Sequence, residues 1–255
     1  MLYCPRCGKE VNEEDTYCKN CGEDLRKPEG SREAPARVGA MDHLTLGFRL
    51  AMEKPMVFAP ALLGGIISML ISVTSRSLVG AYRLRFLHGL GGAPYYPTIS
   101  SSLFLLVGLF SLISFIIMYI LNFVSIDMSR DAYLGKPLRM MGSVNYVMKR
   151  STTFIIASII GAIMSITIIL IPVVIIMFVI LVIDETGVGD AISKAFSVLT
   201  KDLSDVIVIL VIAIVGSLLL GMVPFISKLL TACLNVIIGL AFIDIYFQYK
   251  RQNYI

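Results

Sequence analysis

The chain has 255 residues, of which 56% are hydrophobic and only 16% are charged, and its mean hydropathy is +0.82. Soluble domains contain about a quarter charged residues, so this composition excludes an ordinary soluble protein and indicates an integral membrane protein. The net charge of +4 is small, and we assign it to loops beside membrane spans rather than to nucleic-acid affinity.

Four of the five cysteines lie in the first 25 residues, as two C-x2-C pairs. Two residues between thiolates let one tight turn present both sulfurs to one ion, and two such turns close a tetrahedral site. We therefore predict a structural zinc ion held by Cys4, Cys7, Cys18 and Cys21. Iron in a rubredoxin-like site and disulfide pairing are the alternatives. Because a four-sulfur site is coordinatively closed, it argues against catalytic zinc.

These cysteines resemble the short zinc ribbon at the N-terminus of many archaeal and bacterial membrane proteins, over about residues 1–25. The resemblance implies a structural or contact module rather than a catalytic one. Reduced thiols place the ribbon in the cytoplasm. Residues 1–25 contain three basic and six acidic side chains, an excess that opposes binding to phosphate. We therefore expect the ribbon to bind a protein partner and no nucleic acid.

Pro, Gly, Ser and charged residues dominate residues 26–40, which predicts a flexible linker. All of the long apolar runs lie in the remainder of the chain, residues 41–255. The sequence therefore predicts three parts: a zinc ribbon at 1–25, a flexible linker at 26–40 and a multi-pass membrane domain at 41–255.

Amphipathic helices are expected at three places in the membrane domain. In residues 41–54, Leu44, Phe48 and Met52 fall four apart on one helical face, which predicts a helix in the cytoplasmic interface. An N-terminal extension of the first span is the alternative. We interpret His43 as a surface residue. Similar apolar spacing predicts the other two helices, at about 138–148 and 188–201.

The longest apolar run, residues 154–184, contains no Lys, Arg or His, and its first acidic residue is Asp184. A straight helix of this length would measure about 45 Å, well over the ~30 Å core of a bilayer. Pro172 also lies inside the run. Two interpretations compete: one long kinked span, giving five spans in all, or a tight hairpin of two short spans, giving six.

An internal repeat favours the hairpin. An offset of 96 residues places Phe58 on Phe154, and an offset of 52 residues places Pro172 on Pro224. Each unit contains an amphipathic helix, a cationic residue and two spans. Three units predict six spans, at about 55–75, 100–125, 154–170, 172–184, 205–222 and 225–247.

We therefore predict an all-α polytopic membrane domain of about six transmembrane helices, built as three pseudo-repeats of an amphipathic helix plus a helical hairpin. Residues 128–153 form the most basic loop, which indicates the cytoplasmic side. The arginines of the loop at 76–98 oppose this topology, which places that loop outside. The predicted six-span topology places the protein in the cell membrane, with the ribbon, the amphipathic helices and the C-terminus in the cytoplasm.

The stretch Asp190-Ala191-Ile192-Ser193-Lys194-Ala195-Phe196 and the Ile-Pro pair at 171–172 carry a second resemblance. With the repeating unit itself, they make residues 41–250 look like uncharacterised multi-pass domains related to the membrane portion of glycerophosphoryl diester phosphodiesterases. The catalytic barrel of those enzymes is absent, so the resemblance implies a helical membrane domain without that activity.

The second span of each unit ends in the same way, at Asp127, Asp184 and Asp244. A carboxylate at a helix C-terminus faces the negative end of the helix dipole and needs a partner. Two roles are open: structural pairing with a neighbouring cytoplasmic helix, or an acidic path for ions. The other polar residues at membrane depth, expected to hydrogen-bond between helices or to reach outward, are Asn122, Asn235 and Lys228.

We expect no enzymatic activity, because the two histidines are far apart and no phosphate loop, nucleophile elbow or HExxH motif is present. The predicted function is a membrane-anchored scaffold whose ribbon binds a partner. A transporter, channel or lipid-handling subunit is the alternative, and it would contain a water-accessible cavity. An oligomer is compatible with either function.

Overall fold

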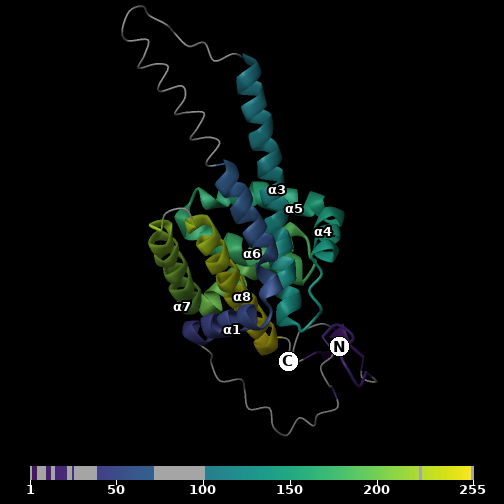
Figure 1. Cartoon of the computed structure of the whole chain (residues 1–255). Coiled ribbons are helices and arrows are strands. Elements are labelled where there is room, and N and C mark those ends of the chain that lie inside the picture. Colours follow the sequence, from purple (N-terminus) through teal and green to yellow (C-terminus); the bar gives the residue numbers. More distant parts are fainter. Residues whose placement is uncertain are drawn as a thin grey trace, which may run out of the picture.

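The structure, a computed structural model, describes residues 2–4, 10–12, 15–21, 25, 39–71, 101–223 and 226–253. Cys7, Pro224, the loop at 76–98 and most of the predicted linker lie outside the described residues. The described part contains a two-stranded ribbon and a bundle of helices, shown in Figure 1.

The two strands of the ribbon, β1 (Leu2–Tyr3) and β2 (Glu10–Val11), pair antiparallel. The helices follow in chain order. They are α1 (Ala40–Glu53), a segment Pro55–Ile71 that begins with η2 (Pro55–Phe58), α3 (Ser101–Tyr133), α4 (Met140–Lys149), α5 (Ser151–Ser165), η3 (Ile168–Leu170), α6 (Ile171–Ile183), α7 (Val188–Gly221) and α8 (Ser227–Asn253).

Each of the three predicted units contains a bend between its amphipathic helix and its first long apolar helix. α1 meets the segment Pro55–Ile71 at 101°, and α4 meets α5 at 77°. In α7 the backbone leaves helical geometry at one residue, Asp202. The bend residues Lys54, Arg150 and Asp202 are spaced by the offsets of 96 and 52 residues that define the repeat. The structure therefore places a break at the equivalent position of all three predicted units.

The long apolar run folds back on itself between α5 and α6. A Cβ atom at Gly161 in α5 would lie 3.0 Å from Val174 and 3.1 Å from Phe178, both in α6. Phe123 of α3 contacts the rings of both Phe154 and Phe178, with centroid distances of 4.3 and 5.2 Å. In a single kinked helix these residues would lie tens of ångströms apart along the axis. The run is therefore a hairpin.

Fewer helices in the described residues are long and apolar enough to cross a membrane than the sequence predicts. Three helices are long and apolar enough to cross a membrane: Gly108–Tyr133, Val188–Gly221 and Ser227–Asn253. Counting each bent pair as one span raises the total to five. α6 has 13 residues, or about 20 Å, and is shorter than a ~30 Å apolar core. Six complete crossings stay a prediction.

The amphipathic helices bury small residues and expose large apolar ones. In α1 the predicted apolar face is turned outward, since Phe48 and Met52 are more than half exposed. The buried face carries Ala40, His43, Gly47 and Ala51. Our interpretation of His43 as a surface residue is therefore wrong, because its side chain is 2% exposed. Small residues let helices approach closely, while large apolar side chains can face lipid.

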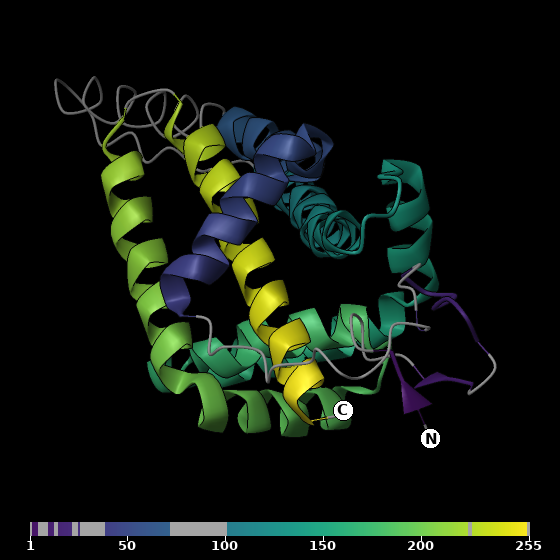
Figure 2. The same cartoon turned by 90° about the horizontal axis from the view of Figure 1, so that it is seen from below.

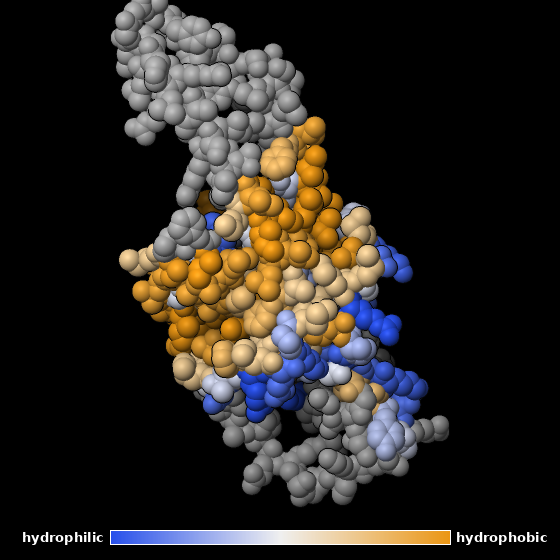
Figure 3. Space-filling view, viewed as in Figure 1, coloured by the Kyte–Doolittle hydropathy of each residue, from blue (hydrophilic) through white to orange (hydrophobic). Residues whose placement is uncertain are grey.

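α8 lies at the centre of the bundle, where it contacts α1, α3, α6 and α7 (Figure 2). Its C-terminal half and α6 are the most buried helical segments. Figure 3 shows apolar side chains over most of the visible face and polar side chains gathered at its lower end. The ribbon and the end of α8 lie at this lower end (Figure 1). We call it the polar end of the bundle.

The crossing of α1 over α8 gives a first prediction. A Cβ atom at Gly47 would lie 2.7 Å from the carbonyl oxygen of Ile237 and 3.2 Å from the backbone nitrogen of Ala241. Backbone atoms cannot rotate away, so we expect Gly47→Ala to lower the free energy of unfolding by about 1–3 kcal/mol. Thermal unfolding of the detergent-solubilised protein measures this change.

The matched control is Gly142→Ala in α4, where the nearest heavy atom to the new Cβ would be Arg139 Cβ at 3.6 Å. This variant should be neutral, or more stable by up to about 1 kcal/mol, because Ala has the higher helix propensity. Equal melting temperatures for the two variants would show that α1 does not pack on α8 as described.

Candidate functional site

The ribbon is built from two short strands and a tight turn. Leu2 pairs with Val11 and Tyr3 with Glu10, which brings Cys4 to the end of β1. The Asn12 backbone N–H donates a 3.0 Å hydrogen bond to Asp15 Oδ2, and this bond, followed by the nearby Lys19 ammonium, lowers the pKa of the Asp15 carboxyl. Asp15 is therefore held ionised just before the second pair of cysteines.

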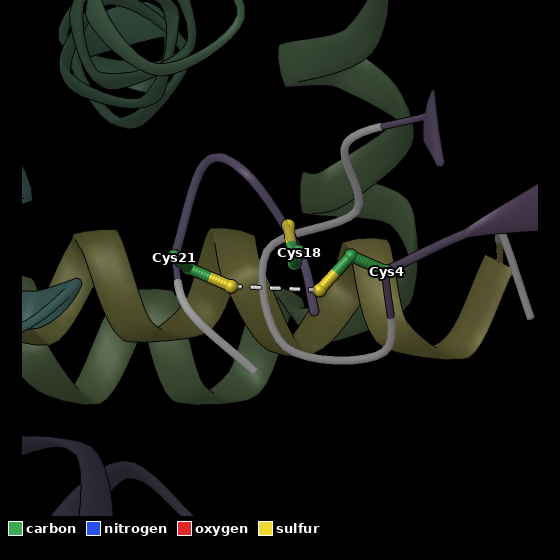
Figure 4. Close-up of side chains that lie close together, drawn as sticks. All are labelled: Cys4, Cys18 and Cys21. Atoms are coloured by element: carbon green, nitrogen blue, oxygen red, sulfur yellow. Dashed lines mark hydrogen bonds between the residues drawn. The ribbon is translucent and has the colours of Figure 1, made fainter. Parts of the chain in front are cut away.

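Three cysteine sulfurs meet between the strand end and this turn. The Sγ atoms of Cys4, Cys18 and Cys21 all lie within 4.8 Å of one another. Figure 4 shows Cys4 and Cys21 pointing toward each other, with their Sγ atoms 3.5 Å apart and Cys18 beside them. Cys4 and Cys18 are buried, at 1% and 2% exposure. Burial of two thiols in so small a unit is what a metal-centred core requires.

This geometry fits a zinc ion. Tetrahedral zinc with Zn–S bonds of about 2.3 Å separates its sulfurs by about 3.8 Å, close to the observed 3.5 Å. The three sulfurs would hold the ion, and Cys7, the predicted fourth ligand, lies outside the described residues. Zinc bound here supplies folding energy to the ribbon, because a unit this small cannot build a sufficient apolar core.

The ribbon contacts the polar end of the bundle. Lys136, in the loop between α3 and α4, donates a 3.1 Å hydrogen bond from Nζ to Asn20 Oδ1, in the turn between Cys18 and Cys21. Gly135 precedes this lysine with a φ of +74°, the left-handed conformation that ends α3 and turns the chain toward the ribbon. The metal site is therefore seated next to the membrane domain.

A second set of charged residues, the polar layer, consists of Asp127, Asp184, Asp244 and their partners. Asp244 in α8 is buried. Its Oδ2 lies 2.6 Å from His43 Nδ1 of α1, and its Oδ1 accepts a 2.7 Å hydrogen bond from the Tyr133 hydroxyl of α3. Arg251 lies about two helical turns further along α8, and its Nη2 is 3.8 Å from Asp244 Oδ1. Asp244 thus joins three helices.

Asp184, which ends α6, is held by two cations and a hydroxyl. Lys194 of α7 lies 2.5 Å from Oδ2, and Lys250 of α8 lies 2.9 Å from Oδ1. The Tyr246 hydroxyl donates a 2.6 Å hydrogen bond to Oδ2. The carboxylate therefore balances charges from two helices that follow it in the chain.

Asp127, in α3, pairs with Arg130 one turn later, at 2.7 Å. Ser143 of α4 also hydrogen-bonds to this buried carboxylate. Arg130 reaches further, donating a 3.0 Å hydrogen bond to the Val182 carbonyl near the end of α6. Asp127 and Arg130 together connect α3, α4 and α6.

The polar layer follows the repeat. Each carboxylate contacts the amphipathic helix of the next unit: Asp127 reaches α4, Asp184 reaches α7, and Asp244 of the last unit returns to α1. The cations beside the bends contact the end of the second long helix of their own unit. These contacts are Lys54 to the Ala132 carbonyl, Arg150 to the Leu181 carbonyl, and Lys201 to the Asn253 side chain.

The structure separates the predicted polar residues into two groups. The three aspartates lie in the polar layer, while Asn122, Asn235 and Lys228 line one cavity elsewhere in the bundle, which none of the three aspartates lines. An ion path through the aspartates therefore stays a prediction. Their geometry is that of carboxylates with cationic or hydroxyl partners.

The carboxylates were predicted from the sequence, but their partners were not. His43 was missed because α1 was expected to lie in the membrane interface, where a histidine away from the apolar face would be exposed. The available signal was the spacing of His43, Gly47 and Ala51, which places a polar side chain on a face of small residues. The tyrosines Tyr133 and Tyr246 carry no comparable signal, because aromatic residues are also expected at membrane interfaces.

Comparison with known proteins supports the ribbon only. A family model of the zinc-ribbon domain matches residues 3–25. No curated protein and no solved structure matches the chain. The ribbon is thus supported by both the family match and the cysteine cluster, whereas the resemblance of residues 41–250 to the membrane portion of glycerophosphoryl diester phosphodiesterases stays a prediction.

Zinc content tests the metal site. We expect the purified protein to contain about one zinc per chain, and Cys18→Ser to contain far less, because a serine hydroxyl replaces a thiolate ligand. Elemental analysis after removal of loosely bound metal measures the content. Cys233→Ser is the matched control, since Cys233 lies in α8 and outside the cluster. Unchanged zinc in Cys18→Ser would contradict the site.

The polar layer gives a prediction about stability. Asp184→Asn leaves the ammonium groups of Lys194 and Lys250 facing each other without the carboxylate charge, so we expect a loss of about 3 kcal/mol in unfolding free energy. Glu185→Gln, at the exposed neighbouring position, should change it by less than about 0.5 kcal/mol. Thermal unfolding in detergent compares them, and equal stabilities would mean that the polar layer does not hold the helices together.

Proposed function

We propose that this protein is a non-enzymatic membrane scaffold, in which the zinc ribbon binds a protein partner and the helical bundle anchors that partner at the bilayer. The observation that carries this proposal is the position of the ribbon. It sits on the polar end of the bundle, where Asn20 accepts a hydrogen bond from Lys136. A small metal-stabilised unit held at a membrane surface presents a fixed surface to a partner.

The charge of the ribbon favours a partner with a basic surface. Residues 1–25 contain six acidic and three basic side chains, while the whole chain has a net charge of +4. The ribbon is therefore the acidic part of a basic protein. Complementary charge raises association rates and selects among partners more than it raises affinity.

A cytoplasmic position for the polar end is part of the proposal. Zinc thiolates persist where thiols stay reduced, and the cytoplasm meets this condition. The basic residues Lys136, Arg139, Lys149 and Arg150 lie on or beside α4, in agreement with the excess of Lys and Arg on cytoplasmic loops. The bundle then serves as the anchor, whether it crosses the bilayer three, five or six times.

Site-specific photocrosslinking tests the proposal. Tyr17 is 49% exposed on the ribbon, close to the cysteine cluster. A photoreactive phenylalanine analogue at Tyr17 should give a discrete adduct in living cells. The adduct should disappear with the additional change Cys18→Ser, because that change removes the metal and the folded surface. Its yield should also fall as ionic strength rises in isolated membranes, because salt screens charged surfaces.

The control places the same photoreactive residue at Glu185, which is exposed between α6 and α7. This position should not give the adduct seen at Tyr17. The proposal is contradicted if Tyr17 gives no adduct, or if Tyr17 and Glu185 give the same products with or without zinc.

A further inference from the structure

A cavity of about 610 Å³ lies between the segment Pro55–Ile71, α3, the end of α7 and α8. It runs along α8 from Ser227 to Ile243, which corresponds to about 24 Å of helix. The carboxylates of the polar layer do not line it. The cavity is therefore separate from the ribbon and extends through the apolar part of the bundle to the edge of the polar layer, where Ser129 and Ile243 line it.

Many of the side chains that line this cavity are polar, although the cavity lies at membrane depth. Asn122 of α3 and Asn235 of α8 face it from opposite helices, and their side-chain amides form no hydrogen bond with any residue that the structure describes. Amide groups at membrane depth are costly unless they find partners. The hydroxyl side chains in the lining are Ser68, Ser125, Ser129, Ser217, Ser227 and Thr231.

Lys228 adds a positive charge at the end of the cavity opposite the polar end. It lies in the first turn of α8, where the positive end of the helix dipole disfavours a cation. Its ammonium makes no ion pair or hydrogen bond within the described part of the chain, and the residue is exposed. A bound anion would compensate both the charge and the unfavourable dipole.

The floor of the cavity is made by small residues, which leave room for a ligand. Gly221 of α7 and Gly239 of α8 line it, and a Cβ atom added at either would meet no heavy atom within 4 Å. The surrounding surface is strongly apolar, since Leu70, Phe115, Leu218 and Met222 are large and exposed. A ligand that satisfies both surroundings has an anionic, hydrogen-bonding head and an apolar body. The volume lies in the usual range for small-molecule sites, about 300–1,000 Å³.

We propose that this cavity binds an anionic phospholipid, with its phosphate at Lys228, its glycerol ester oxygens toward the amides of Asn122 and Asn235, and its acyl chains against the apolar surface outside. The lysine provides the charge selection, and the amides provide hydrogen bonds to glycerol or phosphate oxygens. The site is independent of the ribbon, so it stands whether or not the ribbon recruits a partner.

Photolabelling in nanodiscs tests the site. The full-length protein is placed in phosphatidylcholine nanodiscs that contain a trace of phosphatidylglycerol with a photoreactive group near the head. The label should map to α8 and to the segment Pro55–Ile71, and excess unlabelled phosphatidylglycerol should compete better than phosphatidylcholine. Lys228→Gln should lower labelling about fivefold, since one lysine near an anionic lipid contributes about 1 kcal/mol.

Lys149→Gln is the matched control, because Lys149 is an exposed lysine at the end of α4 and away from the cavity. It should leave labelling unchanged. An equal fall for the two variants, or equal competition by the two lipids, overturns the proposal. Competition by soluble glycerol phosphate at the same concentration overturns it as well, because the ligand is then a free phosphate ester.

A second variant tests the lipid site without changing the charge of Lys228. Asn235→Leu removes one amide from the cavity wall and should also reduce labelling, while the melting temperature of each variant reports its folding. If Lys228→Gln does not fold, the preference of the unaltered protein for phosphatidylglycerol over phosphatidylcholine decides the question alone.

Discussion

The structure depends on the burial of three carboxylates, one near the end of the second long helix of each unit. A buried carboxylate without a partner is far more costly than a buried apolar residue, so each must be matched by a cation or by hydrogen-bond donors. Each finds such a group on the amphipathic helix of another unit, and Asp244 closes the circle by reaching back to His43 of the first helix. Electrostatics therefore determines which helices pack together, in a bundle where apolar contacts alone discriminate weakly between helix faces.

This arrangement also explains why the amphipathic helices and the ribbon lie at the same end of the bundle. The bends at Lys54, Arg150 and Asp202 turn three amphipathic helices across the same end of the bundle. The ribbon rests on the same end through Asn20 and Lys136. The scaffold proposal uses this polar end, whereas the proposed lipid site uses the apolar part of the bundle. The two proposals rest on different residues and can succeed or fail separately.

Much of this architecture could be predicted from the sequence, because the repeat offsets related the three amphipathic helices to one another and the C-x2-C spacing located the metal site. The face by which the amphipathic helices pack on the bundle could not. Hydrophobic periodicity identifies the large apolar residues, such as the exposed Phe48, but it does not identify the small residues, such as Gly47, that face the protein. The pairing of Asp244 with His43 could not be predicted either, because the two residues are 201 positions apart and no local sequence pattern connects them.

Cysteine accessibility in intact cells tests the central claim that the polar layer and the three amphipathic helices lie on the cytoplasmic side. Single cysteines are placed at Ser193, on the exposed surface of α7, and at Gln252, near the end of α8, in a Cys233→Ser background that keeps the ribbon. A third is placed at Gly91, in the loop predicted to lie outside. We expect an impermeant reagent to label Gly91→Cys alone, and the other two cysteines to react only after permeabilisation. Labelling of Ser193→Cys or Gln252→Cys in intact cells would contradict it.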